Sequence, residues 1–279
     1  MYLENRLIAM LDVLGLSSQI EDKNELQKVI EKYNRLIKEA REKVFVNDTL
    51  AGSLETKNYN FEVGEFVFDT LVLVSYPIDV KSSCKFILST LRLMELFSNE
   101  NMPLRGAIGI GDYCADDETK IFLSNVFKQL SKEEQNQQWA GCVLLQEAEE
   151  QIISNVIGRV PMSSKQSDVM HRLSIPIKSD TREIRWCLNW TYQLQESKIK
   201  SLLEYMKGDM VKYEKTKSYI NHIKSLPDEF QLLTPEFSPA TKLKAMKTRA
   251  CMNIRFEDEN GLPAEPGCEQ WNLQVMEAK

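Results

Sequence analysis

The chain has 279 residues, of which 43% are hydrophobic and 27% charged, so it can bury a substantial core and is not typical of a disordered protein. Its 35 Lys and Arg against 41 Asp and Glu give a net charge of −6, which argues against binding to the nucleic-acid backbone. No apolar run approaches the roughly 20 residues of a membrane-spanning helix. Asp12 interrupts the apolar N-terminal stretch, so we expect neither a membrane segment nor a signal peptide.

The cysteine and histidine content excludes several kinds of site. No two of the six cysteines are closer than 17 residues, so the sequence has no CxxC pair for zinc or thiol redox chemistry. We expect a reducing, cytoplasmic location in which the thiols behave as small core residues. The two histidines, His171 and His222, argue against a His-rich metal site and against a Ser-His-Asp or Cys-His mechanism. No GxxxxGK[ST] loop occurs, and carboxylates are therefore the expected catalytic groups of any enzyme here.

The first 113 residues alternate between apolar runs, which predict strands, and segments with a 3.6-residue apolar spacing, which predict helices. The expected order is strand, helix, strand, strand, helix, strand. These elements span residues 6–16, 24–44, 59–67, 71–76, 80–97 and 103–113. This order predicts an α+β fold with a ferredoxin-like βαββαβ core, in which two helices cover one face of an antiparallel sheet.

The rest of the chain predicts an enlarged sheet and then a helical extension. Strands are expected at 119–122, 139–145 and 183–192, helices at 123–135 and 146–157, and irregular chain at 158–181. A single long helix with one apolar stripe is expected at 196–224. A proline-containing tail follows, with one short strand at 251–256. We therefore divide the chain into a catalytic domain, residues 1–192, and a C-terminal extension, residues 193–279.

Two aspartates stand inside apolar strand patterns, Asp12 in LIAMLDVLGL and Asp69 in FVFDTLVLVS. Burying an unpaired carboxylate is costly, so each of them needs a hydrogen-bonded partner or a cation. In the βαββαβ order the first strand is central and pairs with the hairpin strand, which places the two carboxylates beside each other. We interpret them as ligands of one or two Mg²⁺ or Mn²⁺ ions, which prefer oxygen donors and which polarise phosphates.

Both aspartates also have structural interpretations, because Asp residues cap turns and helices, and a hairpin turn at Asp69–Thr70 suits an ordinary Asp. Their occurrence together, with a short turn after Asp12, favours the functional interpretation. The residues of this turn are Val13, Leu14, Gly15 and Leu16. Its backbone N–H groups are expected to face a triphosphate, and Gly15 permits close approach.

These motifs resemble a known family. Asp12 in LDVLGL and Asp69 in FVFDT resemble the two metal-binding aspartates of class III nucleotidyl cyclases. The chain is more similar still to small bacterial cyclase-like proteins that include the pyrimidine cyclases of Pycsar antiphage systems. This similarity lies in ENRLIAMLDVLGL, FVFDT, LRGAIGIGDY, WAGCVL, IPIK and LNW, and it covers roughly residues 4–192.

The resemblance implies a head-to-tail homodimer with active sites at the subunit interface. Asp12, Asp69 and the backbone carbonyl of Val13 would bind two metal ions, Mn²⁺ or Mg²⁺. The ribose 3′-hydroxyl of UTP or CTP would then attack the α-phosphate, giving a 3′,5′-cyclic monophosphate and pyrophosphate. In a Pycsar system this cyclic nucleotide activates a separate effector during phage infection.

The sequence also departs from the family pattern. Class III cyclases usually carry an Asn and, four residues later, an Arg that stabilise the transition state, whereas this chain has Asn125 and Gln129. Lys128 or Arg105 could supply the missing charge. Glu65, four residues before Asp69, is at the place that reads the base in purine cyclases. A glutamate there could accept hydrogen bonds from guanine or from uracil, so the base stays open.

Other candidates have weaker signals. Arg105 in LRGAIGIG is expected to bind phosphate or a base carbonyl, because the flanking glycines leave room for a ligand. Tyr113 and Trp139 could stack on a base, but core packing is the more frequent role of such aromatics. We expect His171 to be exposed and Lys178 to be a surface residue. The remaining alternatives are a guanylyl-type cyclase and a catalytically inactive, nucleotide-binding or regulatory module.

Overall fold

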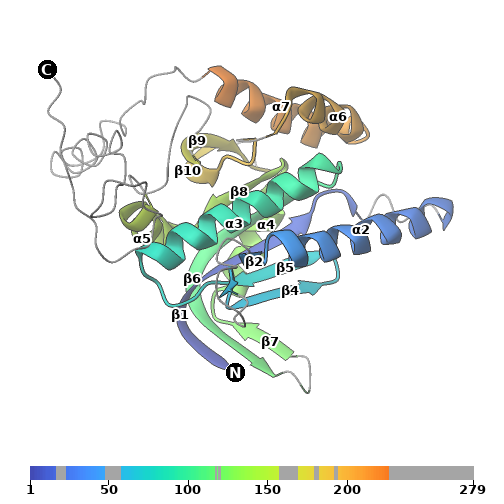
Figure 1. Cartoon of the computed structure of the whole chain (residues 1–279). Coiled ribbons are helices and arrows are strands. Elements are labelled where there is room, and N and C mark those ends of the chain that lie inside the picture. The colour runs from blue at the N-terminus through green and yellow to red at the C-terminus, as the bar shows by residue number, and fades with distance from the viewer. Residues whose placement is uncertain are drawn as a thin grey trace, which may run out of the picture.

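The computed structural model is built around one mixed sheet with helices on both faces (Figure 1). It describes residues 1–16, 23–47, 58–116, 118, 121–156, 169–178, 182–191 and 194–225. The short strand predicted at 251–256 and the proline-containing tail therefore lie outside the described residues.

The predicted βαββαβ unit is confirmed by the strand order. Its elements are β1 (Tyr2–Val13), α2 (Lys23–Lys43), β4 (Val63–Val67), β5 (Thr70–Val74), α3 (Val80–Asn99) and β6 (Leu104–Asp116). The sheet runs β4-β5-β1-β6 and each neighbouring pair is antiparallel. This is the split arrangement in which the first strand is inserted between the third and the fourth, so β1 contacts strands from both halves of the unit.

The two faces of this sheet carry different side chains. Leu11 and Leu71 are paired across β1 and β5 and are fully buried on the first face. Helices α2 and α3 cover that face, as the prediction required, and Tyr33 of α2 packs between Phe66 of β4 and Phe97 of α3. Because side chains alternate along a strand, Asp12 points to the second face.

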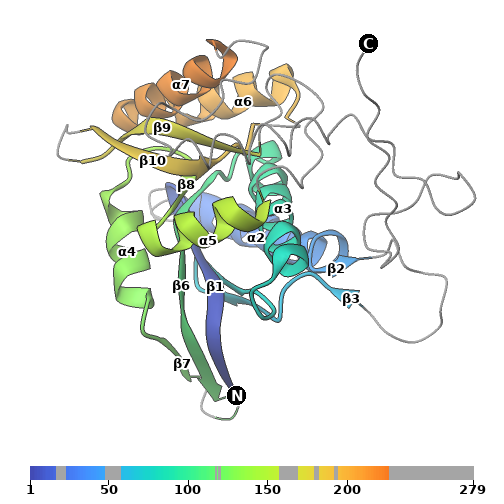
Figure 2. The same cartoon turned by 90° about the vertical axis from the view of Figure 1, so that its left-hand side faces the viewer.

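Helix α4 (Phe127–Asn136) covers part of this second face, on the side of β6 and β1 opposite to α2 and α3 (Figure 2). A Cβ on Gly109 of β6 would meet Leu130 of α4 at 3.3 Å, so the glycine allows the helix to lie close to the strand. Helices therefore lie on both faces of the complete sheet. Beside the edge of α4, the second face at the end of β1 forms the candidate site.

Further strands widen the sheet beyond β6. They are β7 (Ile121–Ser124), β8 (Gly141–Leu144), β9 (Met170–Pro176) and β10 (Arg182–Leu188), with α5 (Gln146–Val156) between β8 and β9. The short strands β2 (Val46–Asn47) and β3 (Asn58–Tyr59) form a separate pair. Strand β9 corrects the prediction of irregular chain at 158–181. It is an edge strand, where Pro176 is tolerated, and its buried residues alternate along HRLSIP.

The C-terminal extension begins with two helices rather than the single predicted one. Helix α6 (Glu196–Met206) and helix α7 (Met210–Ser225) are separated by a turn that contains Gly208, a poor helix former. Asp209 then caps α7 by accepting a hydrogen bond from the backbone of Lys212 at 3.2 Å. Buried residues of both helices belong to the same hydrophobic core as the sheet. The domain boundary at 192/193 stays a prediction.

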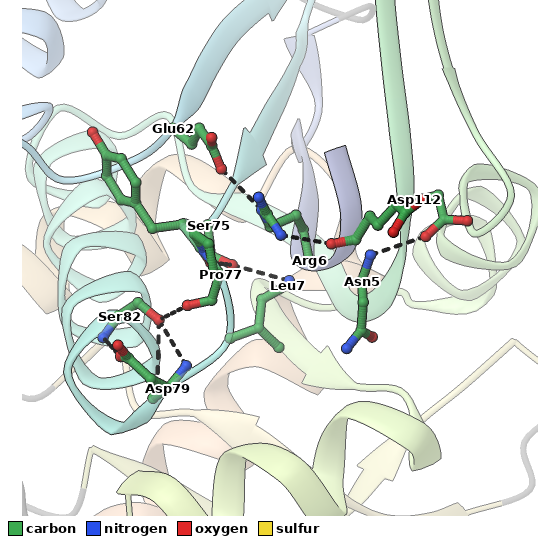
Figure 3. A network of polar contacts seen from close by, with 11 residues as sticks. Asn5, Arg6, Leu7, Glu62, Ser75, Pro77, Asp79, Ser82 and Asp112 are labelled. Atoms are coloured by element: carbon green, nitrogen blue, oxygen red, sulfur yellow. Dashed lines mark hydrogen bonds and ion pairs between the residues drawn. The ribbon is translucent and has the colours of Figure 1, made fainter. Parts of the chain in front are cut away.

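The N-terminal end of β1 is held by a polar network (Figure 3). The pairing of β1 with β6 is interrupted between Leu3 and Arg6, where Asn5 adopts a left-handed φ of 50°. The backbone N–H of Asn5 donates to Asp112 at 2.9 Å, and Arg6 forms an ion pair with Glu62 at 2.9 Å. This end of the strand is therefore fixed by a bulge and by well-matched polar contacts.

A second part of the same network fixes the start of α3 (Figure 3). Asp79 and Ser82 form a capping box, in which the Asp79 carboxylate accepts from the Ser82 backbone at 2.6 Å and the Ser82 hydroxyl accepts from the Asp79 backbone at 3.0 Å. Ser75, at the end of β5, accepts from the backbone of Leu7 at 3.0 Å. These hydrogen bonds thus fix the end of β5 and the start of α3, on either side of the connection formed by residues 75–79.

Candidate functional site

The fold brings Asp12 and Asp69 together. Asp12 is the penultimate residue of β1 and pairs with Thr70, the first residue of β5. Asp69 immediately precedes Thr70, and its carbonyl accepts a hydrogen bond from the Val13 N–H at 3.2 Å. Burial raises the pKa of Asp12, and the charge of Asp69 adds to this shift. Two half-buried carboxylates from separate parts of the chain therefore lie at one end of the sheet.

The turn that carries Asp69 consists of Phe68 and Asp69, one residue earlier than predicted. Phe68 has a left-handed φ of 57°, an unusual conformation for a bulky residue, and its side chain is 92% exposed. The Phe68 carbonyl accepts a hydrogen bond from the Tyr33 hydroxyl at 3.0 Å. Burial raises the pKa of Tyr33, and the charges of Asp69 and Asp12 raise it further. Helix α2 is therefore tied directly to the turn.

Arg105 lies opposite Asp12 on the neighbouring strand β6. Its Nη2 atom is 3.2 Å from Asp12 Oδ2 and 2.5 Å from Glu134 Oε1, and its Nη1 atom donates to the Gln137 carbonyl at 3.0 Å. The side chains of Arg105 and Asp12 are 18% and 16% exposed, and that of Glu134 is 8% exposed. One guanidinium thus joins β1 to the last turn of α4.

This cluster contains more negative than positive charge. Burial raises the pKa of Asp12 to about 7, and the charges of Glu134 and Asp69 act in the same direction, while Arg105 opposes them. Burial likewise raises the pKa of Glu134, against the opposing effect of Arg105. Three carboxylates therefore lie near one guanidinium and the more distant charge of Lys178, and added positive charge would stabilise the ionised form of Asp12.

Glu134 is the site residue that the sequence interpretation missed. It follows Leu130 by one helical turn, so it lies on the apolar face of α4, and both residues are buried. A carboxylate at such a position is the signal that could have identified it. Its partner, Arg105, is distant in sequence, and the pairing emerges only when α4 packs across β6.

The turn after Asp12 requires a correction. The N–H of Val13 donates to the Asp69 carbonyl at 3.2 Å, and the N–H of Leu14 donates to the Pro103 carbonyl at 2.9 Å. These two groups complete backbone pairing and do not face a triphosphate. Gly15 has a left-handed φ of 85°, which suits glycine, and Leu16 packs partly against the core. Phosphate contacts by Gly15 and Leu16 stay predictions.

Glu65 lies on the same face of the sheet as Asp12. It pairs with Val72 of β5, which pairs with Met10 of β1, and Met10 is two residues before Asp12. Cross-strand partners point to the same face, and so do alternate residues of one strand. Glu65 therefore shares the sheet face that carries Asp12, and contact of Glu65 with a base stays a prediction.

Asn125 is not brought to Asp12 within the chain. It lies exposed in the turn before α4, where its side-chain oxygen accepts from the Asp112 backbone at 2.9 Å. It is next to Gly111, six residues along β6 from Arg105, a separation of about 20 Å. Its observed contact is structural.

The other candidates also have defined places. Tyr113 and Trp139 are fully buried in the core, in agreement with the core interpretation. Lys178 is exposed, as expected, and its charge opposes the burial that raises the pKa of Glu134. His171 is buried, contrary to prediction, because it belongs to β9, which pairs with β10 in the sheet, and burial lowers its pKa to about 4.

The donors at the site suit a cation that arrives with a phosphate ligand. In the part of the chain that the structure describes, no group of three or more His, Cys, Asp or Glu side chains could hold a metal ion by itself. Asp12 and Asp69 offer two carboxylates, and Mg²⁺ is commonly bound by one or two carboxylates together with substrate phosphates. The residues present therefore fit such an ion.

Comparisons with known proteins add a similarity of fold only. No family model and no curated protein matches the chain. Among solved structures, it is similar to the crystal structure of the adenylyl cyclase CyaB from P. aeruginosa, with 13% identity and a TM-score of 0.41. The match covers 67% of this chain and 95% of that chain. A likeness of this degree carries no argument about function, and the βαββαβ assignment rests on the strand order described above.

Proposed function

We propose that the chain is a metal-dependent nucleotidyl cyclase that converts UTP or CTP to the 3′,5′-cyclic monophosphate and pyrophosphate. The observation that carries the proposal is the meeting of Asp12 and Asp69 at one end of the sheet. The sequence motifs around both residues support it, because they resemble those of the pyrimidine cyclases of Pycsar antiphage systems. The biological role that we propose, making a second messenger in antiphage defence, rests on this resemblance alone.

Asp12, Asp69 and the Val13 carbonyl would bind Mn²⁺ or Mg²⁺. When bound, such ions supply charge that favours attack by a hydroxyl on a phosphate. Arg105, beside Asp12, would contact phosphate oxygens, to which its planar fork of N–H donors is well suited. The raised pKa of Asp12 is consistent with a site whose negative charge is completed by a cation.

We propose that the active unit is a head-to-tail homodimer. Asn125 lies about 20 Å along β6 from Arg105, so it could act at an Asp12 site only across an interface between two copies. The residue four positions later is Gln129. A cationic residue elsewhere would then have to stabilise the transition state, and Arg105 is the residue best placed to do so.

The base is assigned to the pyrimidine class by resemblance. Glu65, on the same sheet face as Asp12, could accept a hydrogen bond from the N3–H of uracil. It could equally accept hydrogen bonds from guanine, so GTP is the alternative substrate.

A second candidate function is a catalytically inactive module that binds a nucleotide or a regulatory partner. The specific observation in its favour is that Arg105 already contacts Asp12 and Glu134. A guanidinium in that place partly neutralises the carboxylates that a catalytic metal requires. This interpretation predicts nucleotide binding without turnover.

The test is incubation of the purified full chain with ATP, GTP, CTP and UTP separately, with Mn²⁺, and identification of products by mass. A cyclic monophosphate from UTP or CTP that both Asp12→Asn and Asp69→Asn abolish would support the proposal. Glu150→Gln is the control, because Glu150 is an exposed carboxylate on α5 and belongs to no part of the proposed site. Absence of product from a folded dimer would favour the inactive module.

In the part of the chain that the structure describes, no helix combines the length and apolar character needed to cross a membrane.

A further inference from the structure

The segment Gln137–Ala140, which follows α4, lies between the candidate site and the C-terminal helix α7. Gln137 is fully buried. Its carbonyl accepts from Arg105 Nη1 at 3.0 Å, and its side-chain amide donates to the Gly106 carbonyl at 2.8 Å. One residue of the segment is therefore bonded both to the guanidinium and to the strand that carries it.

Helix α7 contacts the next three residues of the same segment. Thr216 accepts a hydrogen bond from the Ala140 backbone at 3.0 Å, and Lys215 Nζ donates to Gln138 Oε1 at 2.6 Å. The ring of Tyr219 packs against that of Trp139, with centroids 4.6 Å apart. Thr216 is fully buried, so the Ala140 N–H has no access to water as an alternative partner.

The outer part of the sheet holds α7 in this position. The Tyr219 hydroxyl donates to the Leu188 carbonyl at 3.1 Å, and Lys215 Nζ also donates to the Ile177 carbonyl at 3.0 Å. Trp190 donates through Nε1 to the Ala140 carbonyl at 2.9 Å. The backbone N–H and C=O of Ala140 are thus both fixed by side chains from the C-terminal half of the protein.

We propose that α7 is a positioning element of the candidate site, in which Thr216, Lys215 and Tyr219 hold Gln137–Ala140 so that Gln137 keeps Arg105 beside Asp12. This role rests on the proposed function, since Arg105 is there the phosphate-contacting residue. None of the three residues of α7 touches the candidate site itself. Their effect passes through the short segment, because a shift of Ala140 moves the carbonyl to which Arg105 donates. Helix α7 is therefore one of the elements that set substrate affinity.

The first experiment compares Thr216→Val with Thr216→Ser and with Ser218→Ala in the full chain. Valine has nearly the shape of threonine but leaves the Ala140 N–H without an acceptor, whereas serine keeps the hydroxyl. Ser218 is exposed on the same helix and serves as the matched control. We expect Thr216→Val to lower kcat/KM for the nucleotide at least fivefold, mainly through KM. Thr216→Ser should keep kcat/KM within twofold of the wild-type value, and Ser218→Ala should leave kcat/KM unchanged.

A merely structural role of Thr216 gives a different result. The valine variant would then melt at a lower temperature, while its folded fraction kept the wild-type kcat/KM within twofold. That outcome would overturn the proposal.

The Arg105→Ala background tests whether the effect passes through the guanidinium. If it does, adding Thr216→Val to Arg105→Ala lowers kcat/KM no further, because the residue to be positioned is gone. A further fivefold fall in the double variant would show that α7 acts independently of Arg105 and would contradict the inference.

A measurement that does not depend on nucleotide turnover tests the positioning by α7 separately from the proposed function. Hydrogen–deuterium exchange of the strand segment 104–108 is expected to be at least threefold faster in Thr216→Val than in the wild type or in Ser218→Ala. If the wild type makes no cyclic nucleotide, the proposed function fails, but faster exchange still supports the positioning by α7. Unchanged exchange at 104–108 overturns the positioning, whatever the activity.

Discussion

The two ends of the paired strands β1 and β6 each hold an arginine beside carboxylates, but they differ in charge balance. At the N-terminal end of β1, Arg6 forms an ion pair with Glu62 and donates to a backbone carbonyl. At the C-terminal end, Arg105 contacts both Asp12 and Glu134. The exposed fraction of these side chains lies between 8% and 24% at both ends, so burial alone does not distinguish the two ends.

The two ends differ in the number of carboxylates whose negative charge acts around the arginine. Among the described residues, Arg6 has one carboxylate, Glu62, as an ion-pair partner, and Asp112 at the same end accepts exposed hydrogen bonds from Tyr2 and from the Asn5 backbone. Arg105 has two such partners, and Asp69 adds a third negative charge that acts on Asp12. A matched pair is sufficient to fix a strand, whereas an excess of buried carboxylate is unfavourable unless a ligand compensates it. The surplus of charge, rather than the presence of an ion pair, marks the functional end.

The largest effect is expected from Asp12→Asn on the pH dependence of stability, measured without metal. The pKa of Asp12 is raised from 3.8 to about 7 on folding. Between these values the folded state binds the proton that the unfolded state has released, so the free energy of unfolding falls as the pH rises from 4 to 7. The loss is on the order of 4 kcal/mol, and it is absent below pH 4.

Asp12→Asn removes this titration. Urea unfolding between pH 4 and pH 8, with a chelator present, should show a variant that is more stable than the wild type at pH 8 and about equal to it at pH 4. Parallel curves for the two proteins across this range would contradict the charge surplus at this end of the sheet.

Glu134→Gln should have the next largest effect. Because the charge of Glu134 raises the pKa of Asp12, the variant should have a lower pKa for Asp12, which carboxyl NMR can follow. We also expect kcat/KM to fall about tenfold, since Arg105 loses a charged partner worth about 1–2 kcal/mol. Glu133→Gln, one residue earlier on α4, is the control. An unchanged pKa of Asp12 would argue against a shared electrostatic site.

At the N-terminal end, Asn5→Ala should lower the free energy of unfolding by about 1 kcal/mol, because alanine adopts the left-handed φ of 50° less readily than asparagine. Asn5→Gly should cost less, since glycine adopts this conformation freely. Denaturant unfolding measures both, and nucleotide turnover should be the same in each. A loss of turnover in either variant would mean that the two ends are coupled.

The smallest effect is expected from Glu62→Gln, which removes the charge that pairs with Arg6. Because water reaches both side chains, we expect this ion pair to contribute about 0.5 kcal/mol to the free energy of unfolding. Unfolding at low and high salt provides the measurement. A loss of more than about 2 kcal/mol would remove the contrast between the two ends.

Much of the fold could be predicted because its signals are local. The apolar spacing of α2 and α3 and the apolar runs of β1 and β5 each lie within about 20 residues, and their order determines the βαββαβ unit. Asp12 and Asp69 were identifiable for the same reason, since each interrupts an apolar run. Their proximity followed from the strand order.

The remaining features depend on contacts between distant segments. Glu134 acquires its partner only when α4 crosses β6, and His171 is buried only because β9 joins the edge of the sheet. The Ser and Pro content of β9 favoured irregular chain over a strand. The apolar stripe is continuous through α6 and α7 and therefore gave no sign of the break between them. The occupied N–H groups of Val13 and Leu14 likewise depend on carbonyls of other elements.

The central position of β1 also has a consequence for synthesis of the protein. Strand β1 is synthesised before both of the strands that pair with it, so its two edges stay unpaired until these later segments arrive. Arg105 is 93 residues beyond Asp12, and Thr216 is a further 76 residues beyond Ala140. Such non-local pairing is slow and leaves an apolar strand exposed in the nascent chain. The candidate site is therefore completed among the last parts of the described fold. A chain that ends before α7 carries Asp12 and Asp69 but lacks the helix that holds Gln137–Ala140 and, through this segment, Arg105.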